Sequence, residues 1–370
     1  MDGKKLKIVG NLLMGIRFSS LMKLILENGI GIRPVHLLRL LVLLPTSLLS
    51  EIFTLVEKIK YNKKIRKTRI EKPPVFIIGH WRSGTTFLHQ LACLDSRFTA
   101  PTVIQTVIPD HFLFSTKYWV PVLKKMMPPK RPMDEVEMGP LDPMEDEWAL
   151  IRMGAPTPFL KLFFPSRRQG FIAGTDEFIP TGKSLEIWKE RFLLLLKKIT
   201  LLTGRQIILK NPFHTPRISM LAEMFPGAKY IHIIRNPYKI VPSSINMWNI
   251  VAGENAFRGG WESPGTEATA RLVEQFRKSV DENRKKLADG SFSEVRYEDL
   301  EKDPVKELKR IYRELDMEFS PEHEKKISEF MEAKKNYRKN IFNLSQEEKN
   351  IINRELEGYM KNYGYESHNV

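Results

Sequence analysis

A glycine-containing turn with an arginine inside it stands between an expected strand and an expected helix. Residues 75–78 are four consecutive apolar residues, residues 79–84 begin and end with glycine around Arg82, and residues 85–94 have a helical apolar face. Backbone N–H groups in such a turn surround an anion, and the helix dipole stabilises it by about 0.3–1 kcal/mol. The segment therefore predicts a phosphate-binding loop.

This loop departs from the Walker pattern of ATP- and GTP-binding proteins. A Walker loop needs Lys followed by Ser or Thr directly after its second glycine, and here Thr85 occupies the lysine position. The nearest cation is Arg82, whose planar guanidinium suits phosphate oxygens but differs in geometry from a lysine. An ordinary strand-loop-helix turn remains the alternative interpretation.

A second cationic turn follows the strand-like residues 228–234. Arg235 stands at the end of this strand, Pro237 suits the first turn of a helix, and Ser243 lies about two turns into it. Open α/β sheets bind ligands beyond the carboxyl ends of their strands. Arg235 and Ser243 are therefore expected to reach one anion there.

A third segment, residues 295–300, reads Val-Arg-Tyr-Glu-Asp-Leu and precedes a helical run that ends at residue 315. In this order, the three motifs resemble those of the sulfotransferases that use 3′-phosphoadenylyl sulfate (PAPS). The resemblance covers residues 74–315 and points to a bacterial branch acting on lipophilic alcohols, with sterol or steroid acceptors among the options. It implies a P-loop-like parallel sheet flanked by helices.

The resemblance also implies which side chains bind PAPS. Loop residues would hold the 5′-phosphate, two residues of the second turn would hold the 3′-phosphate, and two aromatic rings would lie beside the adenine. A basic pair near the C-terminus resembles a further 3′-phosphate clamp, although Asn340 replaces the glycine of that motif. In that order, these residues are Arg82, Ser83, Gly84, Thr85 and Thr86, then Arg235 and Ser243, then Phe87 and Tyr297, and finally Arg338 and Lys339. Core packing is the alternative for Phe87.

The resemblance implies catalytic roles for Arg82 and for Lys210, which ends the strand-like residues 206–210 and would steady the transferring sulfuryl group or its bridging oxygen. Pro212 replaces the catalytic histidine of the cytosolic enzymes, so the base must lie elsewhere. Glu147, in the acidic run 145–147, is preferred slightly over His214. A helix-capping acid or a hydrogen-bonded structural histidine is the alternative for each.

Composition restricts the class of protein. A chain of 370 residues is long enough for one large α/β domain with additions, and its formal charge of +15 predicts an anionic partner. No nucleic-acid-binding motif stands out, so a multiply phosphorylated nucleotide fits this charge better. Cys93 is the only cysteine, which favours a reducing, cytoplasmic compartment, and no histidine spacing indicates a metal site.

Residues 1–72 differ from the rest of the chain. They are rich in leucine, but an uncharged run extends only over residues 40–50, too short to span a bilayer, which needs about 20 residues. Basic residues then follow between positions 58 and 69. Two interpretations stand open: peripheral contact with the inner face of the membrane, or a helical hairpin packed on the core.

We expect the remaining residues 73–370 to form the sulfotransferase domain. Residues 96–180 combine prolines, aromatics and short apolar runs without clear periodicity, as suits a lid and wall for a hydrophobic acceptor. The expected activity is sulfuryl transfer from PAPS to a hydroxyl of a hydrophobic small molecule, without a metal and without nucleic acid. A P-loop kinase or NTPase, and a catalytically silent nucleotide-binding protein at the membrane, are the alternatives.

Overall fold

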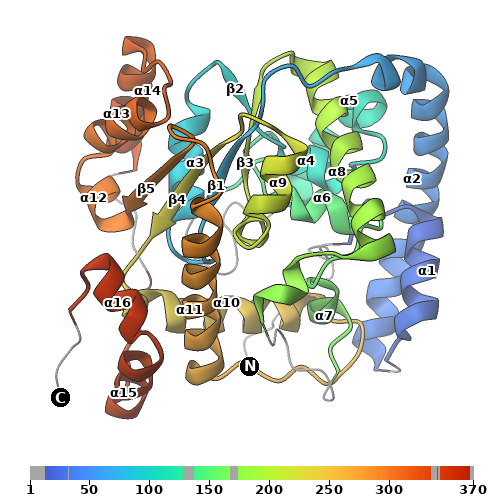
Figure 1. Ribbon diagram of the computed structural model, residues 1–370. Coiled ribbons are helices and arrows are strands. Elements are labelled where there is room, and N and C mark those ends of the chain that lie inside the picture. The colour runs from blue at the N-terminus through green and yellow to red at the C-terminus, as the bar shows by residue number, and fades with distance from the viewer. Residues whose placement is uncertain are drawn as a thin grey trace.

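A five-stranded parallel sheet forms the centre of the molecule (Figure 1). The computed structural model describes residues 13–31, 33–127, 137–166, 174–334, 340 and 342–366. The strand order is β2-β3-β1-β4-β5, and every pair of neighbours is parallel. The strands are β1 Val75–Ile78, β2 Phe98–Thr99, β3 Gln206–Lys210, β4 Lys229–Ile234 and β5 Phe292–Arg296. The expected α/β sheet is therefore confirmed.

Helices cover both faces of this sheet, and further helices precede its first strand and follow its last one. In chain order they are α1 Phe18–Asn28, α2 Pro34–Lys67, α3 Thr85–Cys93, α4 Val103–Val107, α5 Phe112–Met126, α6 Glu147–Arg152, α7 Leu160–Phe163, η2 Thr175–Phe178, α8 Gly182–Thr203, η3 Pro212–His214, α9 Ile218–Met224, α10 Pro237–Asn255, α11 Thr266–Arg284, α12 Tyr297–Lys302, α13 Pro304–Glu314, α14 Pro321–Ala333, α15 Gln346–Glu355 and α16 Glu357–Tyr363.

Alternate residues of each strand point to opposite layers, as the pleat of a strand requires. In β1, Phe76 and Ile78 pack in one core cluster with the apolar faces of α8 and α9. Val75 and Ile77 pack in a second cluster with α3, α13 and α14. Burial on both faces explains the unbroken apolar run of β1, all four residues of which are buried.

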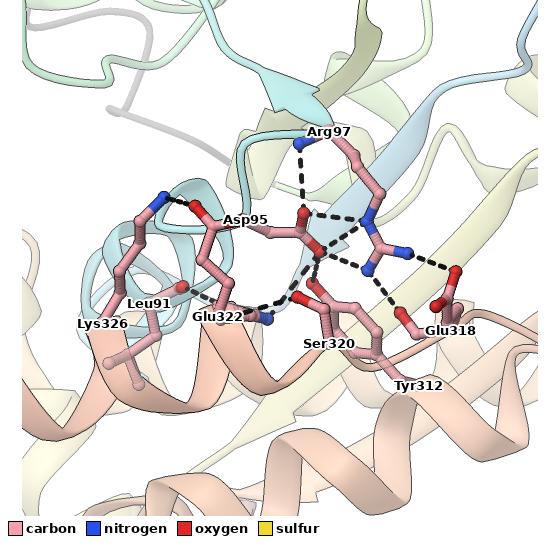
Figure 2. A network of polar contacts seen from close by, with 9 residues as sticks. Leu91, Asp95, Arg97, Tyr312, Glu318, Ser320, Glu322 and Lys326 are labelled. Carbon is pink, nitrogen blue, oxygen red and sulfur yellow. Dashed lines mark hydrogen bonds and ion pairs between the residues drawn. The ribbon is translucent and has the colours of Figure 1, made fainter.

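A polar network fixes the far end of α3, the helix that follows the predicted phosphate loop (Figure 2). The buried Asp95 carboxylate accepts hydrogen bonds from Arg97 Nε at 2.9 Å and from Tyr312 Oη, on α13, at 3.2 Å. His323, on α14, bonds through Nε2 to the carbonyl of Leu91 at 2.9 Å. Burial opposes ionisation of Asp95, but the Arg97 hydrogen bonds outweigh it and lower its pKa. The loop helix is thus held against α13 and α14.

The N-terminal helices α1 and α2 lie at the opposite side of the sheet from α13 and α14 (Figure 1). They contact each other, and α2 also packs on α5 and α8. The expected helical N-terminal extension is therefore present. By length and composition alone, the 34-residue α2 could cross a membrane, and 28% of its apolar 18-residue window is buried; one such helix is weak evidence for a span.

Candidate functional site

The turn after β1 has two positions at which only glycine fits. A Cβ on Gly79 would lie 2.5 Å from the carbonyl oxygen of Ile233, and one on Gly84 would lie 2.2 Å from the ring of Tyr297. Gly84 also has a φ of +100°, which side-chain-bearing residues rarely adopt. Arg82 itself has a φ of +67°. Such backbone strain concentrates at ligand-binding sites.

The two predicted cationic turns meet in the structure. Arg82 Nε donates a hydrogen bond to Ser243 Oγ at 2.8 Å, and a guanidinium nitrogen of Arg235 donates one to the carbonyl of Arg82 at 3.0 Å. Both turns lie at the carboxyl ends of neighbouring strands, since β1 pairs with β4. Arg82, Arg235 and Ser243, up to 161 residues apart in the chain, therefore form one cationic cluster.

The third motif lies against the same loop. The ring of Tyr297, at the start of α12, covers Gly84 and stands 4.2 Å from the guanidinium carbon of Arg235. Its centroid is 6.1 Å from that of Phe87 in an edge-to-face arrangement. The two rings that the resemblance assigned to the adenine are thus neighbours. Ser83 and Thr85 are buried within the turn, and the Ser83 hydroxyl donates to the carbonyl of His80 at 2.7 Å.

Lys210 connects this loop to the acidic run 145–147. It ends β3, and its Nζ lies 3.3 Å from Thr86 Oγ1, at the start of α3. The same Nζ forms a close ion pair with Glu145 Oε1. The Lys210 side chain is 4% exposed and that of Glu145 is 14% exposed. A lysine, a carboxylate and the loop hydroxyl of Thr86 therefore meet at one point beside the cationic cluster.

The carboxylate preferred from the sequence as the base has a different environment. Glu147 is fully buried, and its oxygens bind an Arg217 nitrogen at 2.9 Å, Thr157 Oγ1 at 2.6 Å and Asn211 Nδ2 at 2.9 Å. Both oxygens of Glu147 are therefore engaged by buried side chains. Its role as the base stays a prediction; in the structure Glu147 is the buried partner of Arg217.

His214 is likewise part of the support beneath the site. It is fully buried, with Nε2 placed 2.9 Å from Asp146 Oδ2, and its ring packs edge-on against Phe76. Burial opposes ionisation of Asp146, but His214, Asn211 and Arg217 together lower its pKa. The second candidate base thus contacts a neighbouring carboxylate and apolar rings.

Not every residue considered from the sequence is among those that the structure describes. Arg338 and Lys339 fall outside the described residues. Within the described ranges, no group of three or more His, Cys, Asp or Glu side chains could hold a metal ion.

Tertiary contacts bring in residues that no motif indicated. Tyr359 Oη, on α16, donates to the carbonyl of Arg235 at 2.9 Å and lies 3.2 Å from its backbone nitrogen. Thr215 Oγ1 accepts a hydrogen bond from the Gly79 backbone nitrogen at 2.8 Å. Both fix the backbone of a cationic turn from a distant part of the chain. No local sequence pattern could have identified Tyr359, because its role depends on where α16 packs.

Comparisons with known proteins agree with this geometry. Residues 73–321 match the model of the sulfotransferase family. The chain is 30% identical over 356 residues to the omega-hydroxy-beta-dihydromenaquinone-9 sulfotransferase Stf3 of Mycobacterium bovis, and equally to that of Mycobacterium tuberculosis. The alignment covers 96% of this chain and 91% of each relative.

Solved structures of mycobacterial sulfotransferases share the fold. STF9 of Mycobacterium avium superposes with a TM-score of 0.65 at 18% identity, covering 98% of this chain and 91% of that one. STF1 of Mycobacterium tuberculosis H37Rv superposes with a TM-score of 0.59 at 17% identity, covering 96% and 93%. Both likenesses extend over the whole sheet and its flanking helices.

Proposed function

Because the chain belongs to the sulfotransferase family, we propose that it transfers the sulfuryl group of PAPS to a hydroxyl of a lipophilic alcohol. The second product is adenosine 3′,5′-bisphosphate. The family assignment leaves no support for the P-loop kinase or NTPase alternative, and it also speaks against a catalytically silent protein. We keep the division into a helical segment, residues 1–72, and a sulfotransferase domain, residues 73–370, as part of the proposal.

One observation carries the assignment of the donor. Arg82, Ser243 and Arg235 converge through hydrogen bonds of 2.8 and 3.0 Å at the ends of adjacent parallel strands. A nucleotide with phosphates at both its 5′ and 3′ positions needs more than one cationic group within a single site. Arginine is suited to both, because its planar fork pairs with two phosphate oxygens.

The acceptor class rests on the relatives. By its name, Stf3 acts on omega-hydroxy-beta-dihydromenaquinone-9, and the similarity covers almost all of both chains. We infer that this chain also takes an alcohol with a large apolar body, such as a hydroxylated polyprenyl compound, a sterol or a steroid. The assignment to the cytoplasm, with peripheral contact to the membrane, belongs to the same proposal.

The contacts of Lys210 suggest how the chemistry proceeds. Sulfuryl transfer resembles phosphoryl transfer, with the attacking and leaving oxygens in line, so the protein positions both ends and stabilises the charge on the leaving oxygen. Lys210 lies between Thr86 of the loop and Glu145. We assign Lys210 to the bridging oxygen. Glu145, in place of Glu147 or His214, takes the proton of the acceptor hydroxyl.

Calorimetry with adenosine 3′,5′-bisphosphate tests the donor site without knowledge of the acceptor. The wild-type chain should bind it, and Arg235→Ala and Ser243→Ala should each weaken binding at least tenfold while thermal unfolding stays cooperative. Lys183→Ala, an exposed lysine at the start of α8, is the matched control. A wild-type chain without measurable affinity for the bisphosphate would overturn the proposal.

The base is tested by comparing two glutamates that are two residues apart. Glu145→Gln should lower the rate about 100-fold or more, because an amide cannot take the proton, and it should cost less stability than Glu147→Gln, since Glu145 is 14% exposed and Glu147 is fully buried. Glu147→Gln should chiefly lower the free energy of unfolding, because it weakens the pair with Arg217. Equal rate losses in the two variants would contradict the assignment.

A further inference from the structure

Helix α2 has its polar and apolar sides reversed with respect to the usual arrangement of a surface helix. The side chains that it buries against the body include Ser47, Ser50, Thr54 and Glu57, whereas its outward side consists largely of leucine and isoleucine. A helix on the surface of a water-soluble protein buries its apolar stripe and exposes its polar one. This reversal needs a physical reason.

The inward side of α2 is held by a buried ion pair. Glu57 is 2% exposed, and its Oε1 lies 2.5 Å from Nζ of Lys198, on α8. Glu57 Oε2 also accepts a hydrogen bond from the backbone nitrogen of Phe114, on α5, at 3.0 Å. Near the other end of the helix, Arg39 donates to the carbonyl of Gly253, at the end of α10, at 3.0 Å. These contacts fix α2 lengthwise on the molecule.

The outward side of α2 concentrates the exposed apolar surface of the protein. Of the fourteen large hydrophobic side chains exposed among the described residues, eight lie on α2. Tyr118 and Val122, on the adjoining α5, are exposed as well. The eight side chains of this apolar face are Leu37, Leu38, Leu41, Leu48, Leu49, Ile52, Leu55 and Ile59. Contiguous exposed apolar surfaces mark contact with a partner or a membrane.

The charges around the apolar face identify the kind of partner. The only acidic residues of α2 are Glu51 and Glu57; Glu57 is buried, and Glu51 Oε2 accepts hydrogen bonds from the Ser19 backbone nitrogen at 3.0 Å and from its hydroxyl at 2.8 Å. The end of α2 is strongly basic, and its exposed cations are Lys58, Lys60, Lys63, Lys64, Arg66 and Lys67. An anionic lipid surface complements this pattern. A second copy of the chain would bring like charges together.

We propose that the apolar face of α2 lies in the interface of an anionic bilayer, parallel to its plane, with the basic end of the helix against the lipid head groups. Because α2 is tied to the body through Glu57 and Arg39, it lies on the membrane rather than crossing it. The buried Lys198–Glu57 pair keeps the polar side of the helix turned away from the lipid.

This orientation bears on catalysis as well. A lipophilic acceptor partitions into the bilayer, so an enzyme resting on the membrane collects its acceptor directly from there. Collection of the acceptor from the bilayer rests on the proposed function, whereas binding of the protein to the membrane rests on α2 alone. Vesicle binding therefore tests the docking without any acceptor, and bisphosphate binding reports separately on the donor site.

Flotation with defined vesicles tests the proposal on the full chain. The protein should float with vesicles of phosphatidylcholine mixed with anionic phosphatidylglycerol, and much less with vesicles of phosphatidylcholine alone or at high salt. Leu41→Glu/Leu55→Glu should lower vesicle binding at least tenfold. The matched control is Leu141→Glu/Leu202→Glu, because these leucines are 63% and 55% exposed, against 64% and 55% for Leu41 and Leu55.

The control pair should float as the wild type does, and all variants should retain affinity for adenosine 3′,5′-bisphosphate. Lys63→Glu/Lys67→Glu should selectively reduce binding to the anionic vesicles. Absence of wild-type binding to either vesicle would overturn the proposal. So would a dimer in light scattering that dissociates in Leu41→Glu/Leu55→Glu, because that result would assign the apolar face to a second copy of the chain.

Discussion

The proposed donor site and helix α2 each rest on a buried ion pair, but the two pairs support different kinds of surface. Beneath the proposed donor site, Glu147 and Arg217 are fully buried and form an ion pair inside the core. Under α2, Glu57 and Lys198 are equally buried, yet they hold a helix whose other side is apolar and exposed. Burial of a carboxylate therefore does not by itself identify a catalytic residue. Its role depends on what surrounds the helix or strand that carries it.

Breaking either ion pair should give the largest effect, since removing one partner leaves an uncompensated buried charge. We expect Arg217→Met and Lys198→Met each to lower the free energy of unfolding by about 3–5 kcal/mol. The two variants should differ in which part of the protein is affected. Arg217→Met should destabilise the whole domain, whereas Lys198→Met should weaken the packing of α2. Urea denaturation measures the first effect, and limited proteolysis between residues 34 and 67 measures the second. Identical cleavage patterns in the two variants would contradict this distinction.

Lys210 should separate chemistry from donor binding. Lys210→Ala should reduce kcat by about 10²–10³-fold, as for the loss of one group that stabilises transition-state charge. The affinity for adenosine 3′,5′-bisphosphate should change little, because this product lacks the sulfuryl group. Single-turnover kinetics and calorimetry measure the two quantities, with the exposed Lys183→Ala as control. A parallel loss of both would assign Lys210 to the nucleotide.

Gly84→Ala should weaken donor binding by about 1–3 kcal/mol, because the new Cβ meets a strained φ and the ring of Tyr297. The matched control is Gly253→Ala, near the end of α10, where a Cβ would meet nothing within 4 Å. That change should stabilise the protein by about 0.4–1 kcal/mol. Calorimetry and thermal unfolding distinguish the two outcomes, and equal behaviour of both variants would remove the argument for a constrained loop.

Acidification below about pH 6.5 should destabilise the protein through two buried histidines. Burial, with the charge of Lys210 as a smaller cause, lowers the pKa of His89 to about 3, and burial lowers that of His80 to about 4. In the unfolded chain both histidines bind protons below about pH 6.5, whereas the folded chain keeps them neutral, so stability present above that pH is lost as the pH falls.

The expected slope is up to about 1.4 kcal/mol per pH unit for each histidine. Urea titrations between pH 7.5 and 5 measure it. His89→Gln should remove one histidine's share of the slope, and its stability at pH 7.5 separates the titration from any loss of packing. A slope that is unchanged in His89→Gln would show that His89 does not contribute.

Local patterns predicted the parts of the site that the backbone itself forms. β1, the following turn and α3 matched the expected strand, loop and helix, because apolar runs, glycines and helical periodicity act over a few residues. The same holds for Arg235 and Ser243, whose spacing places them on one strand-to-helix turn. The family resemblance drawn from these motifs is confirmed.

Regions without such patterns were predicted less well. Residues 96–180 showed no clear periodicity, yet they contain α4 to α7, because tertiary packing stabilises short helices that propensity alone does not.

By itself the sequence determined the fold class, the family and the two cationic turns, since each depends on neighbours along the chain. Only the tertiary structure decided which carboxylate of the acidic run 145–147 meets Lys210, that Tyr359 holds Arg235, and which side of α2 faces outward. These are contacts between residues far apart in the chain. The sequence of a helix shows that it has a polar and an apolar side. Only the packing of α2 against α5 and α8 decides which of the two sides is buried.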